Sequence, residues 1–285
     1  MSEDEKIKNG IINVWSNNFT EQYIKMTNLI EKYPYVAMDT EFPGVVARPL
    51  GEFRYQSDHI FQLLRCNVDL LKLIQLGITL MNEKGQVPDG ISTWQFNFKF
   101  NLDVDMHAHD SIQMLQEAGI DFSRHASDGI DHQLFGEMFM VSGLVLNKKI
   151  TWISFHSTYD YGYLMKLLLN KEIPESCQIF LNDMDILFPK HYDIKYLIKS
   201  CGSLKGGLQE LANCLNVERV GMKHQAGSDS LVTGHVFFSL VQLHFDNNIE
   251  GKNYENYMYG LGNSKGMNLE KALETDDLGL PYSIA

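Results

Sequence analysis

The spacing of apolar residues in the first hundred positions predicts three successive β-strands. An apolar run over residues 35–38 ends at Asp39, and residues 42–44 (FPG) then break regular structure, so we expect a central strand that ends in a loop. Residues 71–80 (LKLIQLGITL) are typical of a second, mostly buried strand. Apolar and polar residues alternate over residues 94–100, which predicts a strand with one face in water. Three such strands in succession favour an antiparallel meander.

Helical spacing dominates the rest of the chain. Residues 58–70 place apolar side chains on one helical face, and a strand-like segment at 150–155 is followed by Ser157 as a helix cap. Strands first and helices later, around one mixed sheet, predict a single α/β or α+β domain. Further helices are predicted near residues 110–118, 131–142, 159–169, 175–187, 208–215 and 229–245.

The C-terminal end differs in composition from the rest. After Asn247 the chain becomes rich in asparagine, glycine, tyrosine and charged residues. Such a segment is typical of a loosely ordered terminus. We therefore assign residues 1–248 to the folded domain and expect residues 249–285 to form a loosely attached tail.

The composition limits the classes of function. The 285 residues are 44% hydrophobic, which is enough for a substantial core and excludes disorder over most of the length. The formal net charge of -12 argues against RNA binding through bulk positive charge, so a polyanionic substrate has to be held by a few basic groups or by metal. The sequence has neither an apolar run near the roughly 20 residues of a membrane span nor a signal-peptide pattern. Because the four cysteines form no CxxC pair, we expect reduced thiols in a soluble intracellular protein.

The clearest chemical signal is the DTE sequence at residues 39–41. Asp39 and Glu41 occupy positions i and i+2 of a strand, so their carboxylates share one face. Two carboxylates at the end of an apolar strand suit a cation, although an isolated DxE is more often surface acidity. The DxD sequences at 103–105 and 183–185 are interpreted as solvated.

Distant residues strengthen this signal. His224 is followed five positions later by Asp229, which falls in the first turn of a helix opened by residues 227–228, near the positive end of the helix dipole. Asp160, just beyond a strand-like segment and preceded by an aromatic residue, supplies another carboxylate. His156 is an alternative partner for Asp160, but we interpret it as structural because it ends a buried strand.

In this order, DxE, aromatic-Asp and HxxxxD resemble the DEDD superfamily of 3′ to 5′ exonucleases, in its histidine-bearing subclass. Longer segments resemble the Caf-one (Pop-two) family of poly(A) deadenylases, catalytic subunits of the CCR-four/NOT complex that shorten mRNA poly(A) tails. The resemblance extends from about residue 8 to about residue 263. It is carried by YVAMDTEFPGVVARP, FQLLRCNVDLLKLIQLG, STWQFNFKFN, SFHSTYDYGYL, YDIKYL, LKGGLQELA and HQAGSDSLVTG.

The resemblance implies an α/β, RNase H-like fold in which helices flank a mixed sheet. It also implies two Mg²⁺ or Mn²⁺ ions held by Asp39, Glu41, Asp160 and Asp229, and oxygen ligands do suit these metals. By analogy Asp39 bridges both ions, Glu41 and Asp229 complete the site that activates water, and Asp160 serves the leaving-group ion. His224 is expected to orient or deprotonate the water.

The same resemblance implies a substrate and partners. The substrate is poly(A) RNA and the product 5′-AMP. The expected partners are the scaffold and the companion deadenylase subunits of the CCR-four/NOT complex, in the cytoplasm and the nucleus. None of these expectations follows from composition or spacing.

Other residues are candidates for RNA contacts. Phe42, next to the acidic pair, is interpreted either as a stacking platform for a terminal base or as core. The aromatic residues of 94–100 are interpreted as core rather than as an RNA-binding face. Five basic residues are candidates for phosphate contacts and equally for ordinary solvated charges: Arg48, Arg54, Arg65, Lys195 and Lys205.

Three functions are therefore compared. The first is a metal-dependent 3′ to 5′ exoribonuclease acting on poly(A), and the second is a 3′ to 5′ exonuclease acting on DNA or structured RNA with the same chemistry. The third is an adaptor that uses a nuclease fold only to dock partners. The complete set of four carboxylates, together with His224, favours an enzyme.

Overall fold

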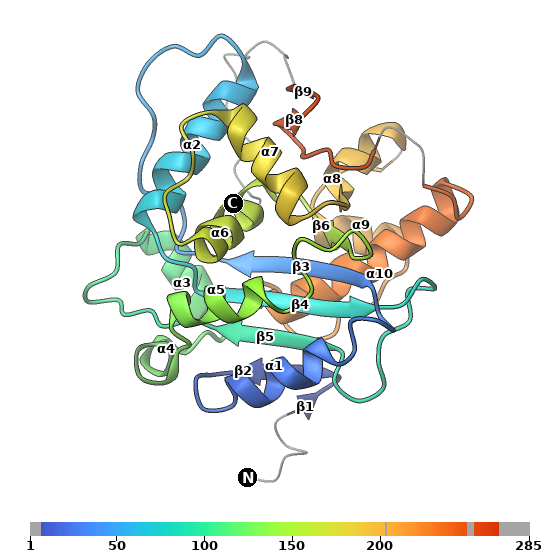
Figure 1. Ribbon diagram of the computed structural model, residues 1–285, viewed down its shortest axis with the longest axis horizontal. Helices are drawn as coiled ribbons and strands as arrows, with labels where there is room; N and C mark the ends of the chain where they lie inside the picture. The colour runs from blue at the N-terminus through green and yellow to red at the C-terminus, as the bar shows by residue number, and fades with distance from the viewer. Residues whose placement is uncertain (1–6, 203, 250–253, 268–285) are drawn as a thin grey trace.

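The computed structural model describes residues 7–202, 204–249 and 254–267, and its centre is a seven-stranded mixed sheet (Figure 1). The strand order is β1-β2-β5-β4-β3-β6-β7. The strands are β1 (Ile7–Lys8), β2 (Ile11–Val14), β3 (Tyr35–Glu41), β4 (Gln75–Met81), β5 (Thr93–Asn97), β6 (Thr151–Ser154) and β7 (His191–Asp193).

The predicted antiparallel meander forms the middle of this sheet. Strand β4 pairs antiparallel with both β3 and β5, and its register places Gly77 opposite Asp39 and Gln75 opposite Glu41. Strand β6 adds to β3 in the parallel direction, so the carboxyl ends of β3 and β6 lie at the same edge. The acidic end of β3 therefore meets the segment that follows β6, and the predicted α/β fold with a mixed sheet is confirmed.

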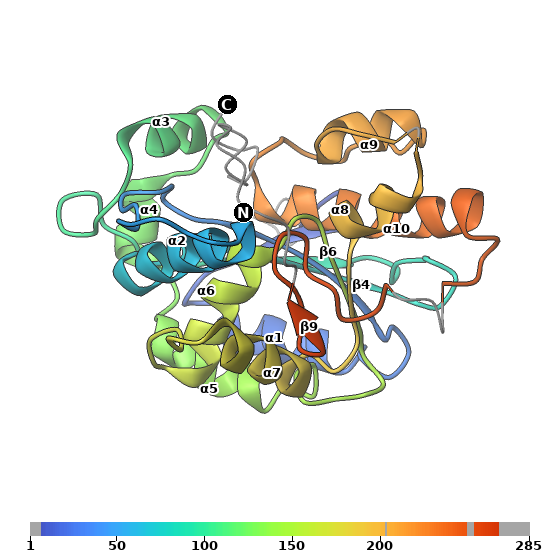
Figure 2. The ribbon, with the colours of Figure 1, turned by 90° about the horizontal axis from the view of Figure 1, so that it is seen from above.

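Helices cover both faces of the sheet. Figure 2 shows α9 and α10 on one side of the strands and α1, α5 and α7 on the other. Each predicted helix is present, and α1, α4 and the short α8 are additional. The helices are α1 (Phe19–Thr27), α2 (Gln56–Leu70), α3 (His109–Glu117), α4 (Phe122–Asp128), α5 (His132–Met140), α6 (Thr158–Leu169), α7 (Cys177–Leu187), α8 (Ile194–Leu197), α9 (Leu208–Cys214) and α10 (Ala226–His244). Among the described residues, none of these helices combines the length and apolarity that crossing a membrane requires.

Helix α10 lies directly on the central strands because two glycines remove side chains from the contact. A Cβ atom on Gly77 of β4 would lie 1.9 Å from the carbonyl oxygen of Ala226, and one on Gly234 would lie 2.5 Å from the terminal methyl of Met81. Real side chains do not approach this closely, so a larger residue at position 77 would push the helix backbone away, and one at position 234 would displace the Met81 side chain. This close approach brings the first turn of α10 over the end of β3.

Strand β5 corrects one prediction. Its aromatic residues Trp94 and Phe96 are fully buried, which confirms their interpretation as core. The alternating face was predicted to lie in water, yet Gln95 and Asn97 are only 4% and 0% exposed. The reason is that the beginning of α10 covers this face, and the buried amides are hydrogen-bonded to other side chains and to the backbone.

Part of the predicted tail is packed onto the domain. Met258 and Leu261 are 1% and 0% exposed and belong to the main core cluster, and a short hairpin of β8 (Gly262–Asn263) and β9 (Gly266–Met267) follows. The hydroxyl of Ser264 donates a hydrogen bond to Asp185 of α7, which was predicted to be solvated. The expectation of loose attachment is therefore wrong for residues 254–264, while residues 250–253 and 268–285 lie outside the described residues.

Candidate active site

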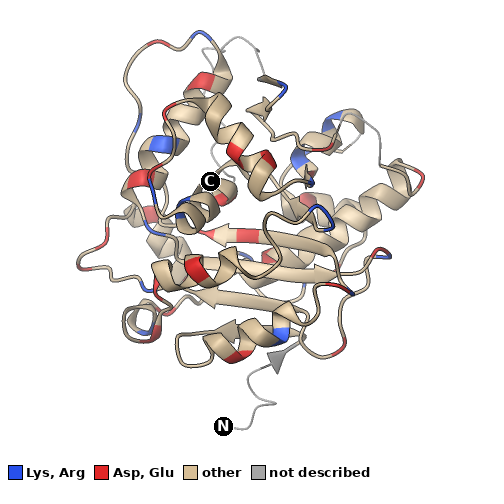
Figure 3. Cartoon of the chain, viewed as in Figure 1, with Lys and Arg blue, Asp and Glu red and all other residues tan. Residues whose placement is uncertain are grey.

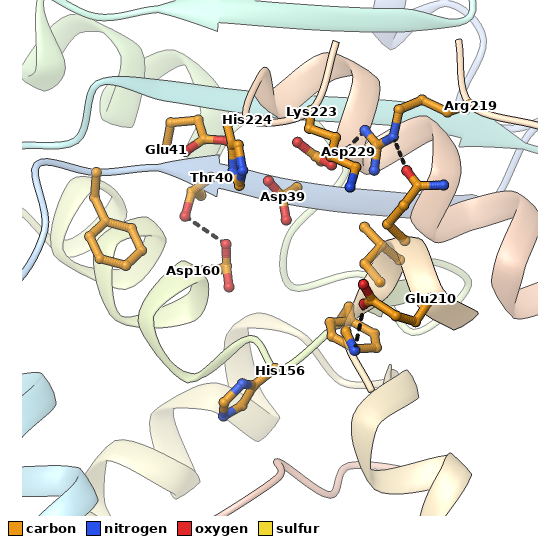
Figure 4. A pocket seen from close by; sticks show the side chains of 15 residues that line it. Asp39, Thr40, Glu41, His156, Asp160, Glu210, Arg219, Lys223, His224 and Asp229 are labelled. Atoms are coloured by element: carbon orange, nitrogen blue, oxygen red, sulfur yellow. Dashed lines mark hydrogen bonds and ion pairs between the residues drawn. The ribbon is translucent and has the colours of Figure 1, made fainter. Parts of the chain in front are cut away.

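Three carboxylates from two elements converge at the end of β3. Asp39 and Glu41 project from the same face of the strand, as alternation predicts, and Asp229 reaches them from the first turn of α10. One carboxylate oxygen of each residue lies within 4.8 Å of the others, and Figure 4 shows the three groups directed toward one another. Glu41 and Asp229 are buried and Asp39 is half-buried.

Asp160 lies next to this group and is held by a separate contact. It occupies the first turn of α6, immediately after β6, and its Oδ1 accepts a 2.6 Å hydrogen bond from the hydroxyl of Thr40. Thr40 lies between Asp39 and Glu41 in the DTE sequence. The same strand segment therefore provides two carboxylates and the hydroxyl that orients the carboxylate of Asp160. The structure thus brings all four predicted carboxylates together, three as a compact cluster and Asp160 at its side (Figure 4).

The electrostatics of the cluster oppose full ionisation in the absence of a cation. Burial, followed by the charges of Asp229 and Asp160, raises the pKa of Asp39 and the pKa of Glu41 well above their usual values. Burial also raises the pKa of Asp160 to about 7, although the hydrogen bond from Thr40 acts in the opposite direction. A divalent cation would neutralise this repulsion, so the cluster fits a metal-binding role.

His224 belongs to the loop that enters α10. Its backbone has φ +60°, in the left-handed region that is uncommon for residues other than glycine, and the side chain is half-buried at the rim of the same cavity. Burial lowers the pKa of His224, while the neighbouring Asp229 acts to raise it. A lowered pKa keeps the imidazole neutral at pH 7, which is the form that can accept a proton.

His156 also lines the cavity, farther from the cluster (Figure 4). Its ring packs edge-on against Tyr259 with 5.0 Å between the ring centroids, and its backbone N–H donates to Asp193 at 2.8 Å. Burial lowers the pKa of His156. These contacts agree with the interpretation of His156 as a structural residue.

Two basic residues of the site were missed by the sequence reasoning. Arg219 forms a 2.7 Å ion pair with Asp229 and also donates to Gln209 and Ser228, at 2.5 Å and 3.0 Å. Lys223 is exposed and lines the cavity beside His224. Both precede α10 in an irregular segment without apolar periodicity. The one feature of the sequence that points to them as site residues is their position within five residues of His224.

The five basic residues that were predicted to contact phosphates do not line this cavity. Arg48, Arg54 and Lys205 are exposed, Arg65 approaches Glu175 at 3.5 Å, and the Lys195 ammonium donates to the Gly206 carbonyl at 2.7 Å. In the view of Figure 3 the basic residues are scattered over helices and loops, while acidic residues interrupt β3. None of the five side chains therefore lines the cavity, and their contacts with phosphates stay a prediction.

The carboxylates form the floor of a cavity of about 320 Å³. Phe42 lines this cavity and also stacks on Tyr159, with 5.1 Å between ring centroids and 12° between ring planes. The stacking on Tyr159 agrees with the interpretation of Phe42 as core, and its role as a platform for a terminal base stays a prediction. The wall opposite comes from the start of α9, through Gly207, Leu208, Gln209 and Glu210.

Comparison with known proteins gives consistent matches over most of the chain. A family model described as CAF1 family ribonuclease matches residues 14–134 and 137–237. Poly(A) ribonuclease pop2 of Schizosaccharomyces pombe is 47% identical over 254 residues, which are 89% of this chain and 76% of that protein.

Solved structures agree with this match. The Mg²⁺- and Mn²⁺-bound form of S. pombe Pop2p has a TM-score of 0.86 and 47% identity, and the match covers 88% of this chain and all of the other. Yeast CAF1, co-crystallised with the NOT1 MIF4G domain, is represented by a structure with a TM-score of 0.73 and 30% identity, over 87% of this chain and 96% of that chain.

Proposed function

Because the chain belongs to the CAF1 family of ribonucleases, we propose that it is a metal-dependent 3′ to 5′ exoribonuclease that shortens poly(A) and releases 5′-AMP. The observation that carries this proposal is the convergence of Asp39, Glu41 and Asp229 within 4.8 Å at the floor of a cavity, with Asp160 beside them. An adaptor that only docks partners would not need four carboxylates held at mutual repulsion in a buried site.

The residues present fit divalent metal ions. All the candidate ligands are carboxylate oxygens, which suit Mg²⁺ and Mn²⁺, and the S. pombe relative has been solved with both metals. We propose that Asp39, Glu41 and Asp229 would hold one ion and that Asp160 together with Asp39 would hold a second. When bound, such ions make water nucleophilic at neutral pH and stabilise the oxygen that leaves.

Side chains of the protein position the metal-binding carboxylates and accept a proton. Because burial lowers its pKa, His224 is neutral at pH 7, and an unprotonated ring nitrogen accepts the proton of the attacking water. Thr40 holds Asp160 in one orientation through its 2.6 Å hydrogen bond. Arg219 holds Asp229 at 2.7 Å, so the two carboxylates on the helices are each fixed by a donor from a neighbouring segment.

Two residues at the edge of the cavity are assigned to contacts with the RNA. Lys223 is the exposed cation at the rim of the cavity, so we place a phosphate of the RNA next to it. Phe42 supplies an apolar edge on which the terminal base packs. The preference for adenine rests on the relative named Poly(A) ribonuclease and not on any single contact.

A scaffold partner is also proposed. The yeast CAF1 structure was obtained with the NOT1 MIF4G domain, and the two chains share 30% identity over most of their length. We propose that this chain binds an equivalent scaffold and works with a companion deadenylase in a CCR-four/NOT complex.

The direct test is degradation of synthetic RNA by the purified chain. An all-adenosine 20-mer and a mixed-sequence 20-mer are incubated with Mg²⁺, with Mn²⁺ or with EDTA, and the products are separated by length. We expect stepwise shortening of the adenosine oligomer, release of 5′-AMP and complete inhibition by EDTA. The Asp39→Ala variant is the matched control, because it removes the carboxylate shared by both ions, and it should be inactive while folded.

Two outcomes would contradict the proposal. Equal degradation of a matched DNA oligomer would favour a nuclease of broader specificity. Intact RNA with either metal, from protein that has a cooperative melting transition, would favour the adaptor.

A further inference from the structure

Five amide side chains form a hydrogen-bonded network behind the active site, in which Gln75, Gln95 and Asn97 are buried, Gln225 is half-buried and Asn13 is exposed. They come from β2, β4, β5 and the residue before α10: Asn13, Gln75, Gln95, Asn97 and Gln225. The Gln75 amide donates to Asn97 Oδ1 at 2.8 Å, and the Gln95 amide donates to Asn13 Oδ1 at the same distance. Asn97 donates to the Val14 carbonyl at 3.1 Å. The network thus links three neighbouring strands on the face that α10 covers.

This network also caps helix α10. The backbone N–H of Ala226 donates to Gln75 Oε1 at 3.2 Å, and that of Gly227 donates to Gln95 Oε1 at 2.9 Å. The residue at the N-cap position, Gln225, provides no side-chain cap to its own helix. Strand amides therefore satisfy free N–H groups that a serine or aspartate usually satisfies.

Gln225 connects the network to the active site. Its Oε1 accepts hydrogen bonds from Gln95 at 2.8 Å and from Gln75 at 3.3 Å, and its Nε2 donates to the Ala118 carbonyl at 2.9 Å. The next residue toward the N-terminus is His224, whose backbone is in the left-handed region. Within the described part of the chain no hydrogen bond of the His224 ring is found, so the backbone sets its position.

We propose that Gln225 is a positioning residue: clamped by Gln75 and Gln95, it fixes the turn from which His224 faces the carboxylate cluster. This inference rests on the proposed function, in which His224 accepts the proton of the attacking water. The anchor lies on the strand next to the one that carries Glu41, because Gln75 of β4 is the cross-strand neighbour of Glu41. The carboxylates and the histidine are thereby positioned by the same sheet.

The clamp acts on His224 and not on metal binding, because Asp229 has its own anchors. Arg219 holds its carboxylate, and the next residue, Ser230, bonds to Thr79 of β4 at 2.9 Å. Removing the Gln225 side chain also leaves the bonds from the Ala226 and Gly227 N–H groups intact. The helix and its carboxylate therefore stay in place while the preceding turn loses its anchor.

The test uses Gln225→Met, which keeps the volume and removes all three hydrogen bonds. Gln86→Met is the matched control. Gln86 is an exposed glutamine in the β4–β5 connection, and its side-chain amide is hydrogen-bonded only to nearby Asn82. We expect kcat on the adenosine oligomer to fall by about 10- to 100-fold, the usual cost of a small misplacement. The KM for RNA, and the Kd for Mn²⁺ measured by calorimetry without RNA, should stay within about threefold of wild type.

Two further measurements separate positioning from a general structural role. In a His224→Ala background Gln225→Met should cause no additional loss, because both changes act through one group. Gln225→Glu, which keeps the oxygen that accepts from Gln75 and Gln95, should recover part of the rate. In RNA-free protein the NMR signal of the His224 ring Cε1–H should shift or broaden in Gln225→Met and not in Gln86→Met.

The inference is overturned by an unchanged His224 signal, by losses that add in the double variant, or by Mn²⁺ affinity that falls in step with kcat. The NMR measurement does not depend on activity. A wild-type chain that leaves RNA intact would refute the proposed function, whereas an active wild type with an equally active Gln225→Met variant would refute only the positioning role.

Discussion

At the residue scale the site consists of groups whose protonation is set by their neighbours. Three buried or half-buried carboxylates repel one another, and the basic Arg219 compensates only one of them directly. Burial keeps His224 neutral, although the charge of the neighbouring Asp229 favours its protonated form. The arrangement stores repulsion that a cation relieves, so the catalytic and metal-binding properties of the site depend on the same contacts.

Replacing His224 tests its assigned role as a proton acceptor. His224→Ala should lower kcat by about 10²- to 10⁴-fold, the usual contribution of general acid-base catalysis, while Mn²⁺ affinity is preserved by the carboxylates. Activity of the wild type should fall on acidification below the lowered pKa of His224, and this acid limb should be absent from the variant. A pH profile of kcat with a saturating metal concentration measures both effects. An acid limb that survives in His224→Ala would assign it to protonation of the metal ligands.

Lys223 and Lys205 form a matched pair of exposed lysines. Lys223 lines the cavity and Lys205 does not. Lys223→Ala should weaken RNA binding and reduce the slope of log affinity against log salt by about 0.7, the value for one phosphate contact on a single strand. Lys205→Ala should leave both quantities unchanged. Fluorescence anisotropy of a labelled adenosine oligomer in a salt series distinguishes them, and equal effects of the two substitutions would show that Lys223 has no specific contact.

The raised pKa of Asp160 predicts how the metal-free protein responds to pH. Burial raises the pKa of Asp160 from 3.8 to about 7, so between these values the folded protein binds more protons than the unfolded chain. The free energy of unfolding then decreases as pH rises through this window, and each kcal/mol lost lowers Tm by roughly 2–4 °C in a domain of this size. Asp160→Asn should show a smaller decrease, because an amide keeps the hydrogen bond from Thr40 and does not ionise. Melting curves with EDTA from about pH 4.5 to about pH 7.5 measure the difference; parallel curves for the two proteins would contradict the assignment.

At the scale of elements, the segment after α10 completes the core. Leu261 is fully buried in the main cluster, so Leu261→Ala should lower the free energy of unfolding by about 2–5 kcal/mol. Leu243→Ala in α10 is the control, because this leucine is 61% exposed and its loss should cost at most about 0.5 kcal/mol. Urea denaturation followed by tryptophan fluorescence provides both values. Equal, small effects would restore the prediction of a loosely attached tail.

Elements with a strong apolar period could be predicted from the sequence. Elements that form only because a neighbouring strand or helix pairs with them could not. Strands β3 and β4 and helices α2 and α10 have continuous or periodic apolar residues, so the sequence places them within a few residues of their observed bounds. Strand β2 has four residues and a polar continuation, and it exists because β5 offers it an edge. The polar side of β5 was assigned to water because glutamine and asparagine side chains need hydrogen-bond partners, which water usually provides. The sequence does not show that the start of α10 provides a partner instead.

The same distinction applies to the site. Asp39 and Glu41 follow from strand alternation, whereas Asp160, His224 and Asp229 were joined to them through the family resemblance. Arg219 and Lys223 lie in a segment without periodicity, so their charge alone did not separate them from other basic residues. Nothing local in the sequence reveals the amide clamp, because its members are separated by up to 212 positions and meet only in the fold.

At the scale of the whole molecule, a chain with a net charge of -12 has to bind a polyanion. In the described cavity the only fixed cations that line it are Arg219, which is engaged with Asp229, and Lys223. The mean field of the protein therefore repels RNA, and the attraction has to come from the bound metal and from very few side chains. The dependence of RNA binding on divalent metal and on monovalent salt should differ accordingly.

If two phosphate contacts supply the monovalent-salt dependence, the slope of log affinity against log salt is about -1.4, so a fourfold rise in KCl weakens binding by about sevenfold. An extended basic groove with six or more contacts would lose about 300-fold or more over the same range. The measurement uses Asp160→Asn, to prevent degradation, with a labelled adenosine oligomer, a KCl series, and either Mn²⁺ or EDTA. We expect chelation to weaken binding more than the fourfold rise in KCl does. Tight binding in EDTA with a steep salt slope would show a basic surface outside the cavity and would contradict the metal-centred account, whereas the loss of binding in EDTA with a shallow slope explains how so acidic a protein accepts RNA at all.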